Sequence, residues 1–259
     1  MVNKNPTRKL REKLTVRGVL SFLIIFSMVR QFFLGNYYYM FLGLLTLILF
    51  MIPIIVDRKM KVDIPPLLEA IILLFIFSAE ILGEINAFYI KIPIWDTVLH
   101  TLNGFLMAAI GFCLVDFFNR SERFSIQMSP LFLAIVAFCF SMTTAVLWEF
   151  FEFGMDMFVG VDMQKDWIVH EISSVMLDPT GSNIPVKLKI DSVMVNGKDL
   201  GFGGYLDIGL IDTMKDMIVN FVGAVVFSVI GYLYIKTRGK GKIAKGLIPV
   251  VRMDDEDTK

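Results

Sequence analysis

Polar and ionisable residues recur at helical spacing where apolar segments of this sequence begin or end. Asp96, His100 and Asn103 open one such segment at positions i, i+4 and i+7, so they share one helix face. Carboxylates and imidazoles bind divalent cations and transfer protons. Each ionisable group costs about 2.5–3.5 kcal/mol at the centre of a membrane span, so such grouping indicates a functional site.

Two later apolar segments repeat this pattern. Glu149 and Glu152 end one segment at i and i+3, and Asp212, Asp216 and Asn220 open another at i, i+4 and i+8. On each helix the polar groups again share a face. Three helices therefore present polar faces that could meet, provided that their ends lie at one level.

The elements that must position these residues are predicted to be membrane-spanning helices. The chain of 259 residues is 56% hydrophobic and has a mean hydropathy of +0.66, and its apolar residues occur in runs of about 20. We expect spans at 17–34, 37–56, 65–84, 96–118, 129–153 and 212–236.

The basic residues predict the direction of these spans. Most of the 25 lysines and arginines fall in the N-terminal arm 1–16, the second-to-third and fourth-to-fifth loops, and the tail 237–259. The positive-inside rule then places both termini in the cytoplasm of a multi-pass protein of the bacterial cytoplasmic membrane. Glu69, one turn inside a cytoplasmic helix end, is expected to snorkel toward water.

The segment 154–211 is too polar to span and is predicted to be a small extracytoplasmic cap. It contains an expected amphipathic surface helix and a β-hairpin that turns at Asn196-Gly197, a favoured type I′ pair. The apolar side of that helix would consist of Trp167, Ile168, Ile172 and Val175. The predicted fold class is an all-α polytopic membrane protein with six transmembrane helices, of which 17–153 holds the first five, and a cap that contains a β-hairpin.

This topology brings the polar helix faces to one level, just under the outer surface. The predicted metal ligands are Asp96, His100, Glu149, Glu152, Asp212 and Asp216. Mg²⁺, Ca²⁺ or Mn²⁺ suits the carboxylates, and one histidine keeps Zn²⁺ open. Glu149, Glu152 and His100 are also the candidate catalytic acid–base groups, and Asn103, Asn220 and Arg30 are candidate ligand-binding residues. Helix-end acids such as Asp156 and interface aromatics such as Trp148 are interpreted as structural.

These motifs resemble those of a known family. Asp96-x-x-x-His100, Trp148-Glu149-x-x-Glu152 and the Asp212-Thr opening of the last span, with Asp216, Asn220 and Gly223-Ala224, are similar to YjdF-type bacterial inner-membrane proteins and, more remotely, to VanZ-like proteins. The resemblance covers residues 60–236. It implies a cell-envelope membrane protein and no assigned activity.

Three functions fit the sequence. The first is an envelope protein whose acidic site binds a divalent cation and, through it, an amphiphile or lipid phosphate headgroup; an enzyme of this kind would be a metal-dependent hydrolase or transferase acting on a lipid-linked substrate. The alternatives are a proton- or cation-coupled transporter and a structural membrane scaffold. Membrane lipids are the expected partners and nucleic acid is not; the oligomeric state is open.

Overall fold

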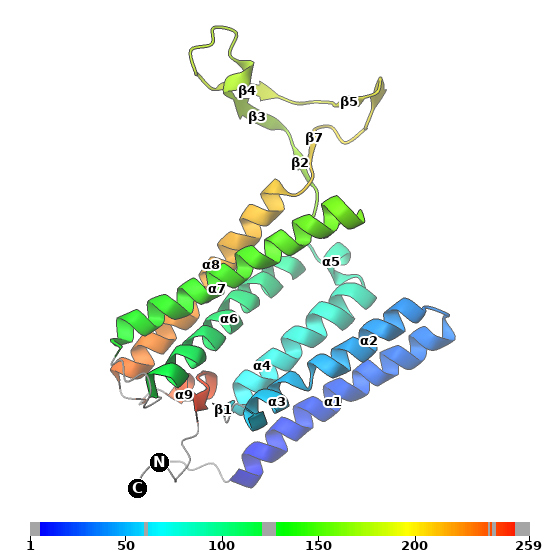
Figure 1. Cartoon of the computed structure of the whole chain (residues 1–259). Helices are drawn as coiled ribbons and strands as arrows, with labels where there is room; N and C mark the ends of the chain where they lie inside the picture. The colour runs from blue at the N-terminus through cyan, green and yellow to red at the C-terminus, as the bar shows by residue number, and fades with distance from the viewer. Residues whose placement is uncertain (1–5, 60–61, 121–127, 238, 240–241, 252–259) are drawn as a thin grey trace. The chain divides into compact units, whose positions relative to one another are not determined.

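The computed structural model describes residues 6–59, 62–120, 128–237, 239 and 242–251. The chain is mostly helical and divides into two compact units (Figure 1). The first unit contains Met1–Ala145 and Ile218–Lys259, and the second contains Val146–Met217. The long helices α7 and α8 contribute to both.

Among the described residues, six helices are long and apolar enough to cross a membrane. They are Glu12–Phe33, Tyr37–Lys59, Pro66–Ile85, Trp95–Val115, Pro130–Val159 and Leu210–Lys236. The six predicted spans are thereby confirmed. Their predicted direction stays a prediction, and part of the basic sequence that supports it, including 121–127 and 252–259, lies outside the described residues.

The points at which helices within these spans begin, break or end have identifiable causes in the sequence. Pro53 lacks the N–H that would continue the hydrogen-bond ladder after α2, and Pro66 occupies the first turn of α4, where that N–H has no helical partner. The third and fifth spans end in π-helical turns at Ser78–Ile85 and Met155–Val159. The helices are α1 (Pro6–Phe33), α2 (Tyr37–Leu49), α3 (Ile52–Lys59), α4 (Pro66–Phe77), α5 (Phe88–Lys91), α6 (Trp95–Arg120), α7 (Pro130–Gly154), α8 (Leu210–Lys236) and α9 (Lys242–Leu247).

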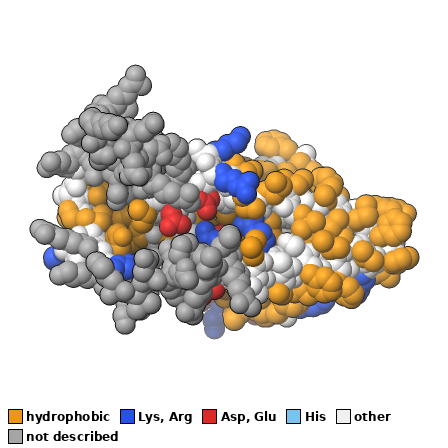
Figure 2. Space-filling model, turned by 90° about the horizontal axis from the view of Figure 1, so that it is seen from below, with side chains coloured by type: hydrophobic (Ala, Val, Ile, Leu, Met, Phe, Trp, Pro, Cys, Tyr) orange, Lys and Arg blue, Asp and Glu red, His pale blue; other side chains and the backbone are white. Residues whose placement is uncertain are grey.

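In the first unit, α1 packs against α2 and α4 (Figure 1). The core of this group contains Leu20, Ile24, Phe50, Leu73 and Phe77. Hydrophobic side chains cover the helix flanks visible in Figure 2, and charged side chains lie between them on that face. Because lipid surrounds a spanning bundle, an apolar exterior is the expected arrangement.

An ion cluster joins α1, α3 and α4. Glu69 of α4 contacts Lys13 at 3.0 Å and Arg17 at 2.5 Å, and Lys13 lies 3.5 Å from Asp57 of α3. Arg17 also donates to the carbonyl of Phe50 at 2.6 Å, at the break between α2 and α3. The expectation that Glu69 snorkels was wrong: it is 5% exposed, because two cations from α1 compensate its charge inside the bundle.

Helices α6 and α8 touch backbone to backbone at two glycines. A Cβ atom on Gly104 would lie 2.0 Å from the carbonyl oxygen of Asn220, and one on Gly223 would lie 1.9 Å from that of Thr101. Small residues permit such close approach, which is a common way for helices to associate in lipid. Ala108, Ala224 and Phe227 continue this packing in a hydrophobic core to which α7 also contributes.

The chain after α8 returns to this core. Ala244 of α9 and the adjacent Ile248 are buried in the cluster that α6, α7 and α8 form. Beyond them β8 (Val250–Val251) pairs antiparallel with β1 (Val62–Asp63), which follows α3. The C-terminal segment thereby ties two distant parts of the sequence together at one end of the first unit.

Most of the second unit is an extended arm, residues 161–208, built from two-stranded pairs. Strand β2 (Trp167–Val169) pairs with β7 (Tyr205–Asp207), β3 (Glu171–Ser174) with β4 (Val186–Lys189), and β5 (Met194–Val195) with β6 (Lys198–Asp199), all antiparallel. The predicted hairpin at Asn196-Gly197 is present, and both residues have the positive φ values, 51° and 77°, that a type I′ turn requires.

The amphipathic helix expected around Trp167 to Val175 is absent from the structure, where β2, β3 and a 3₁₀ turn occupy those residues. Ile168 and Ile172 are four residues apart, a spacing that places two side chains on one face in a helix and in a strand alike. The β-branched residues Ile168, Val169 and Ile172 favour the strand.

A turn that follows β3 is organised by one carboxylate. Asp178 accepts hydrogen bonds from the hydroxyl and the N–H of Thr180, and from the N–H groups of Ser182 and Ile184. These bonds, led by the Thr180 hydroxyl, lower the pKa of Asp178 because they favour the ionised form.

Replacing Glu69 with glutamine is expected to destabilise the protein by about 3 kcal/mol, because Arg17 would lose its carboxylate partner inside the bundle and Lys13 would keep only the longer contact with Asp57. Thermal unfolding in detergent measures the loss. Glu84→Gln, at an exposed position, is the matched control. Equal melting temperatures for the two variants would contradict the structural role of the ion cluster.

Gly223→Ala is expected to cost about 1–3 kcal/mol, because the new methyl group would collide with the backbone of α6, which has no rotamer to change. Gly18→Ala is the control, since a Cβ there meets nothing within 4 Å and alanine favours the helix. Denaturation of both variants in the same detergent tests the contact. A Gly223→Ala protein as stable as Gly18→Ala would rule out the close approach.

The Asp178 turn should loosen in acid. A lowered folded-state pKa means that the carboxylate stabilises the turn above its unfolded pKa of about 3.9, and that this contribution disappears as pH falls through the folded value. The amide chemical shifts of Thr180 and Ser182 report the titration, which Asp178→Ala should abolish. A midpoint above the ordinary aspartate value would refute the assignment.

Candidate functional site

Three carboxylates of the second unit converge. One oxygen each from Glu149 and Glu152 of α7 and from Asp216 of α8 lies within 4.8 Å of the other two. All three side chains are buried; their exposed fractions are 4%, 7% and 2%. Oxygen ligands of one Mg²⁺ or Ca²⁺ ion sit about 2.0–2.6 Å from it, so they lie within about 5 Å of one another. This group, called here the carboxylate cluster, has the dimensions of a cation site.

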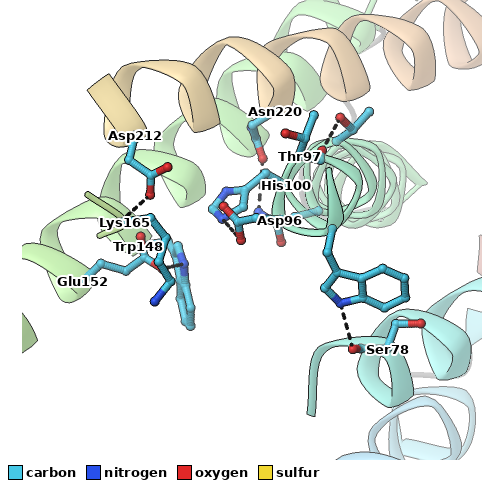
Figure 3. A network of polar contacts seen from close by, with 12 residues as sticks. Ser78, Asp96, Thr97, His100, Trp148, Glu152, Lys165, Asp212 and Asn220 are labelled. Carbon is cyan, nitrogen blue, oxygen red and sulfur yellow. Dashed lines mark hydrogen bonds and ion pairs between the residues drawn. The ribbon is translucent and has the colours of Figure 1, made fainter. Parts of the chain in front are cut away.

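The spacing of residues along α7 and α8 explains how the three side chains of the carboxylate cluster are positioned. Glu149 and Glu152 are one turn apart near the end of α7, so both project from the same face. Asp216 lies in the second turn of α8, on the same face as Asp212. Trp148 donates its indole N–H to Oε1 of Glu152 at 2.9 Å and fixes that carboxylate (Figure 3). Trp148, interpreted from sequence as an interface aromatic only, therefore also orients a member of the cluster.

The loop after α7 is held in place by Asp156 and by a contact with α8. Asp156 accepts the N–H groups of Met163 at 2.6 Å and Gln164 at 2.8 Å. The buried side chain of Gln164 donates to the hydroxyl of Thr213 at 2.5 Å and thereby links the loop to α8. Asp156 has the structural role that its place at a helix end indicated. Gln164 was not anticipated, because it belongs to no periodic pattern, and Thr213 was noted only as part of the Asp212-Thr motif, without a role.

Asp212 also binds this loop. Its carboxylate accepts the N–H of Lys165 at 2.8 Å (Figure 3). It also accepts the indole N–H of Trp167 at 3.4 Å. Lys215, one turn along α8, places its ammonium 4.3 Å from the centre of the Trp167 ring. In the second unit, as far as it is described, the carboxylate cluster contains Asp216 and not Asp212. A ligand role for Asp212 stays a prediction.

Asp96 and His100 form a pair in the first unit. Nε2 of His100 lies 3.6 Å from Oδ1 of Asp96, one turn earlier on α6, and the two side chains are 12% and 26% exposed. The start of α6 is fixed by Trp95, whose indole N–H donates to the carbonyl of Ser78 at 3.3 Å (Figure 3). A carboxylate beside a histidine suits metal ligation or proton transfer. That this pair shares an ion with the carboxylate cluster stays a prediction.

The two predicted asparagines meet each other. Asn103 donates from Nδ2 to Oδ1 of Asn220 at 3.1 Å, and Asn220, fully buried, also points Nδ2 at the hydroxyl of Ser141, 3.5 Å away. Ser141 in turn donates to the carbonyl of Gly104 at 2.8 Å. These bonds join α6, α7 and α8 in lipid, where unpaired polar groups are costly. Ser141 was missed because it is a single polar residue in an apolar run.

Arg30 is an exposed side chain near the end of α1. Its predicted role in ligand binding has no contact in the first unit that would support it, among the contacts of described residues, and stays a prediction. Glu80 and Glu84 lie on the π-helical turn Ser78–Ile85 of the same unit. Within the second unit, as far as it is described, the carboxylate cluster is the group whose geometry suits a cation.

Comparisons with known proteins agree with a membrane protein. The chain is 25% identical, over 158 residues, to an uncharacterised protein of Thermotoga maritima, an alignment that covers 60% of this chain and 76% of that protein. No solved structure matches the chain. A family model described as a predicted membrane protein, DUF2238, matches residues 13–237. The chain therefore belongs to the DUF2238 family of predicted membrane proteins.

Proposed function

We propose that this protein is a multi-pass protein of the bacterial cytoplasmic membrane in which Glu149, Glu152 and Asp216 bind a divalent cation, and that the cation holds the phosphate headgroup of a lipid or similar amphiphile. Both termini would be cytoplasmic, which places the carboxylate cluster near the outer surface. The observation that carries the proposal is the convergence of three buried carboxylates within 4.8 Å.

Electrostatics supports a cation. Three carboxylates at this separation repel one another, and burial removes the water that would screen them. Neighbouring hydrogen-bond donors, protons or a metal ion can offset that repulsion. A divalent cation does so while it satisfies several carboxylate oxygens at once. Because all three groups are oxygen ligands, Mg²⁺, Ca²⁺ and Mn²⁺ suit them better than metals that prefer sulfur or nitrogen.

A phosphate-bearing amphiphile fits the location. Mg²⁺ bound by protein carboxylates usually keeps further coordination positions for water or phosphate oxygens. The cluster lies on helices that are apolar enough to span a membrane, so its surroundings suit a ligand with a hydrocarbon part. When bound, the metal would supply Lewis-acid chemistry for hydrolysis or transfer. Glu149 or Glu152 would then hold or release the proton of the attacking group.

Divalent cations should stabilise the wild-type protein and fail to stabilise Asp216→Asn. At a hundredfold excess over the dissociation constant the expected gain is about 2.7 kcal/mol. Thermal unfolding with and without MnCl₂, together with metal analysis of the dialysed protein, measures it. Asp166→Asn, an exposed neutralisation in the same unit, should behave as wild type.

The metal-free Asp216→Asn protein distinguishes this proposal from a structural scaffold. Removing one of three repelling charges should leave the metal-free protein as stable as wild type or more stable. A marked loss of stability without any effect of metal would instead indicate that the acids only hold the fold. Phosphate recognition is tested separately: a short-chain phosphatidate should bind in the presence of Mn²⁺ and dissociate on addition of EDTA.

A further inference from the structure

The arm, residues 161–208, leaves a strand edge unpaired. In the part of the chain that the structure describes, β4 has one hydrogen-bonded neighbour, β3. The pairing continues past Glu171 and Lys189 to the N–H of Ile190, which donates to the carbonyl of His170 at 2.9 Å. Antiparallel pairs alternate between bonded and non-bonded, so Leu188 bonds across to Ile172, whereas Lys187 and Lys189 direct their backbone groups away from β3.

This edge has two distinct faces. Successive side chains of a strand point to opposite sides, so Lys187 and Lys189 share one face and Leu188 lies on the other. Leu188 is 48% exposed, and an isolated two-stranded ribbon is only marginally stable without a further strand or a helix that covers its apolar face. Exposed backbone donors and acceptors and an exposed leucine make β4 a template for an additional strand, and its two lysines disfavour any added strand that is not acidic.

Charge limits what that strand could be. A second copy of β4 packed antiparallel would oppose Lys187 to Lys189 of the other copy, and like charges directly opposite are destabilising. An extended anionic surface would be repelled by the rest of the arm, in which acidic residues outnumber lysines. The acidic residues of the arm are Asp162, Asp166, Glu171, Asp178, Asp191, Asp199 and Asp207, and its lysines are Lys165, Lys187, Lys189 and Lys198.

A single acidic strand avoids both problems. The arm itself contains an example: Glu171 of β3 stands opposite Lys189 and lies 3.2 Å from the ammonium of Lys187. A partner strand on the open side of β4 would repeat this pattern, with carboxylates beside the lysines and an apolar side chain beside Leu188. In Figure 1 the β2–β7 pair lies between the helix ends of the second unit and the β3–β4 ribbon. The ribbon is therefore at the far end of the arm, where a separate polypeptide can reach it.

We propose that the open edge of β4 binds an extended segment of another protein in which acidic and apolar side chains alternate, by adding it as a strand. The backbone N–H and C=O groups of Lys187 and Lys189 supply the hydrogen bonds, their ammonium groups select acidic side chains, and Leu188 selects an apolar one. This interaction is independent of the carboxylate cluster.

A short capped peptide of alternating glutamate and valine is the probe, added to the full-length protein in nanodiscs. Fluorescence anisotropy should show binding that weakens by about tenfold or more in the double variant Lys187→Glu, Lys189→Glu, because two attractions become repulsions. The double variant should instead prefer a lysine–valine peptide. Lys198→Glu, a change of the same type on β6, should bind the original peptide as wild type does.

Hydrogen exchange gives a second readout. In the free protein the amide of Leu188 should be protected and those of Lys187 and Lys189 should exchange quickly; the peptide should slow the two lysine amides. Absence of binding, equal binding by a backbone N-methylated peptide, or unchanged affinity in the double variant would each overturn the proposal. So would charge-dependent binding of the arm to anionic vesicles in place of the peptide.

Discussion

The close contact between α6 and α8 is the constraint on which the first unit depends. Gly104 and Gly223 let each helix rest against the other's backbone, and no larger residue fits at either position. Once the helices are this close, Asn103 and Asn220 are within hydrogen-bond reach, and Ser141 can bond the Gly104 carbonyl from α7. In a solvent as apolar as the protein interior, such packing and polar pairing replace the hydrophobic effect as the source of helix association.

Buried charge is handled in two different ways in this chain. Around Glu69, acids and bases are matched, and the ion cluster joins helices that would otherwise meet only through apolar side chains. Around Glu149, three acids are gathered, with one oxygen of each within 4.8 Å of the other two. Matched charges stabilise the packing of the helices that carry them, whereas like charges held together repel one another, and a bound cation would offset that repulsion. This contrast supports a structural role for the ion cluster and the proposed cation-binding role for the carboxylate cluster.

The second unit combines a loop that is hydrogen-bonded to α8 with an exposed arm. The loop that follows α7 is held to α8 by Gln164 and by the two hydrogen bonds that Asp212 accepts. Farther along, the arm consists of two-stranded pairs with few buried side chains and exposed edges. The helix ends are thus supported close to the carboxylate cluster, while the arm presents backbone and side chains outward.

Periodicity and composition in the sequence predicted the six membrane spans, the convergence of Glu149 and Glu152 on one helix face, and the turn at Asn196-Gly197, because each depends on residues close in the chain. Only the tertiary structure decided that Asp216 joins those glutamates while Asp212 binds a loop, that Glu69 is buried against α1, and that strands replace the expected surface helix. These outcomes depend on which distant element lies opposite each side chain, and the spacing of residues along one segment carries no information about that neighbour.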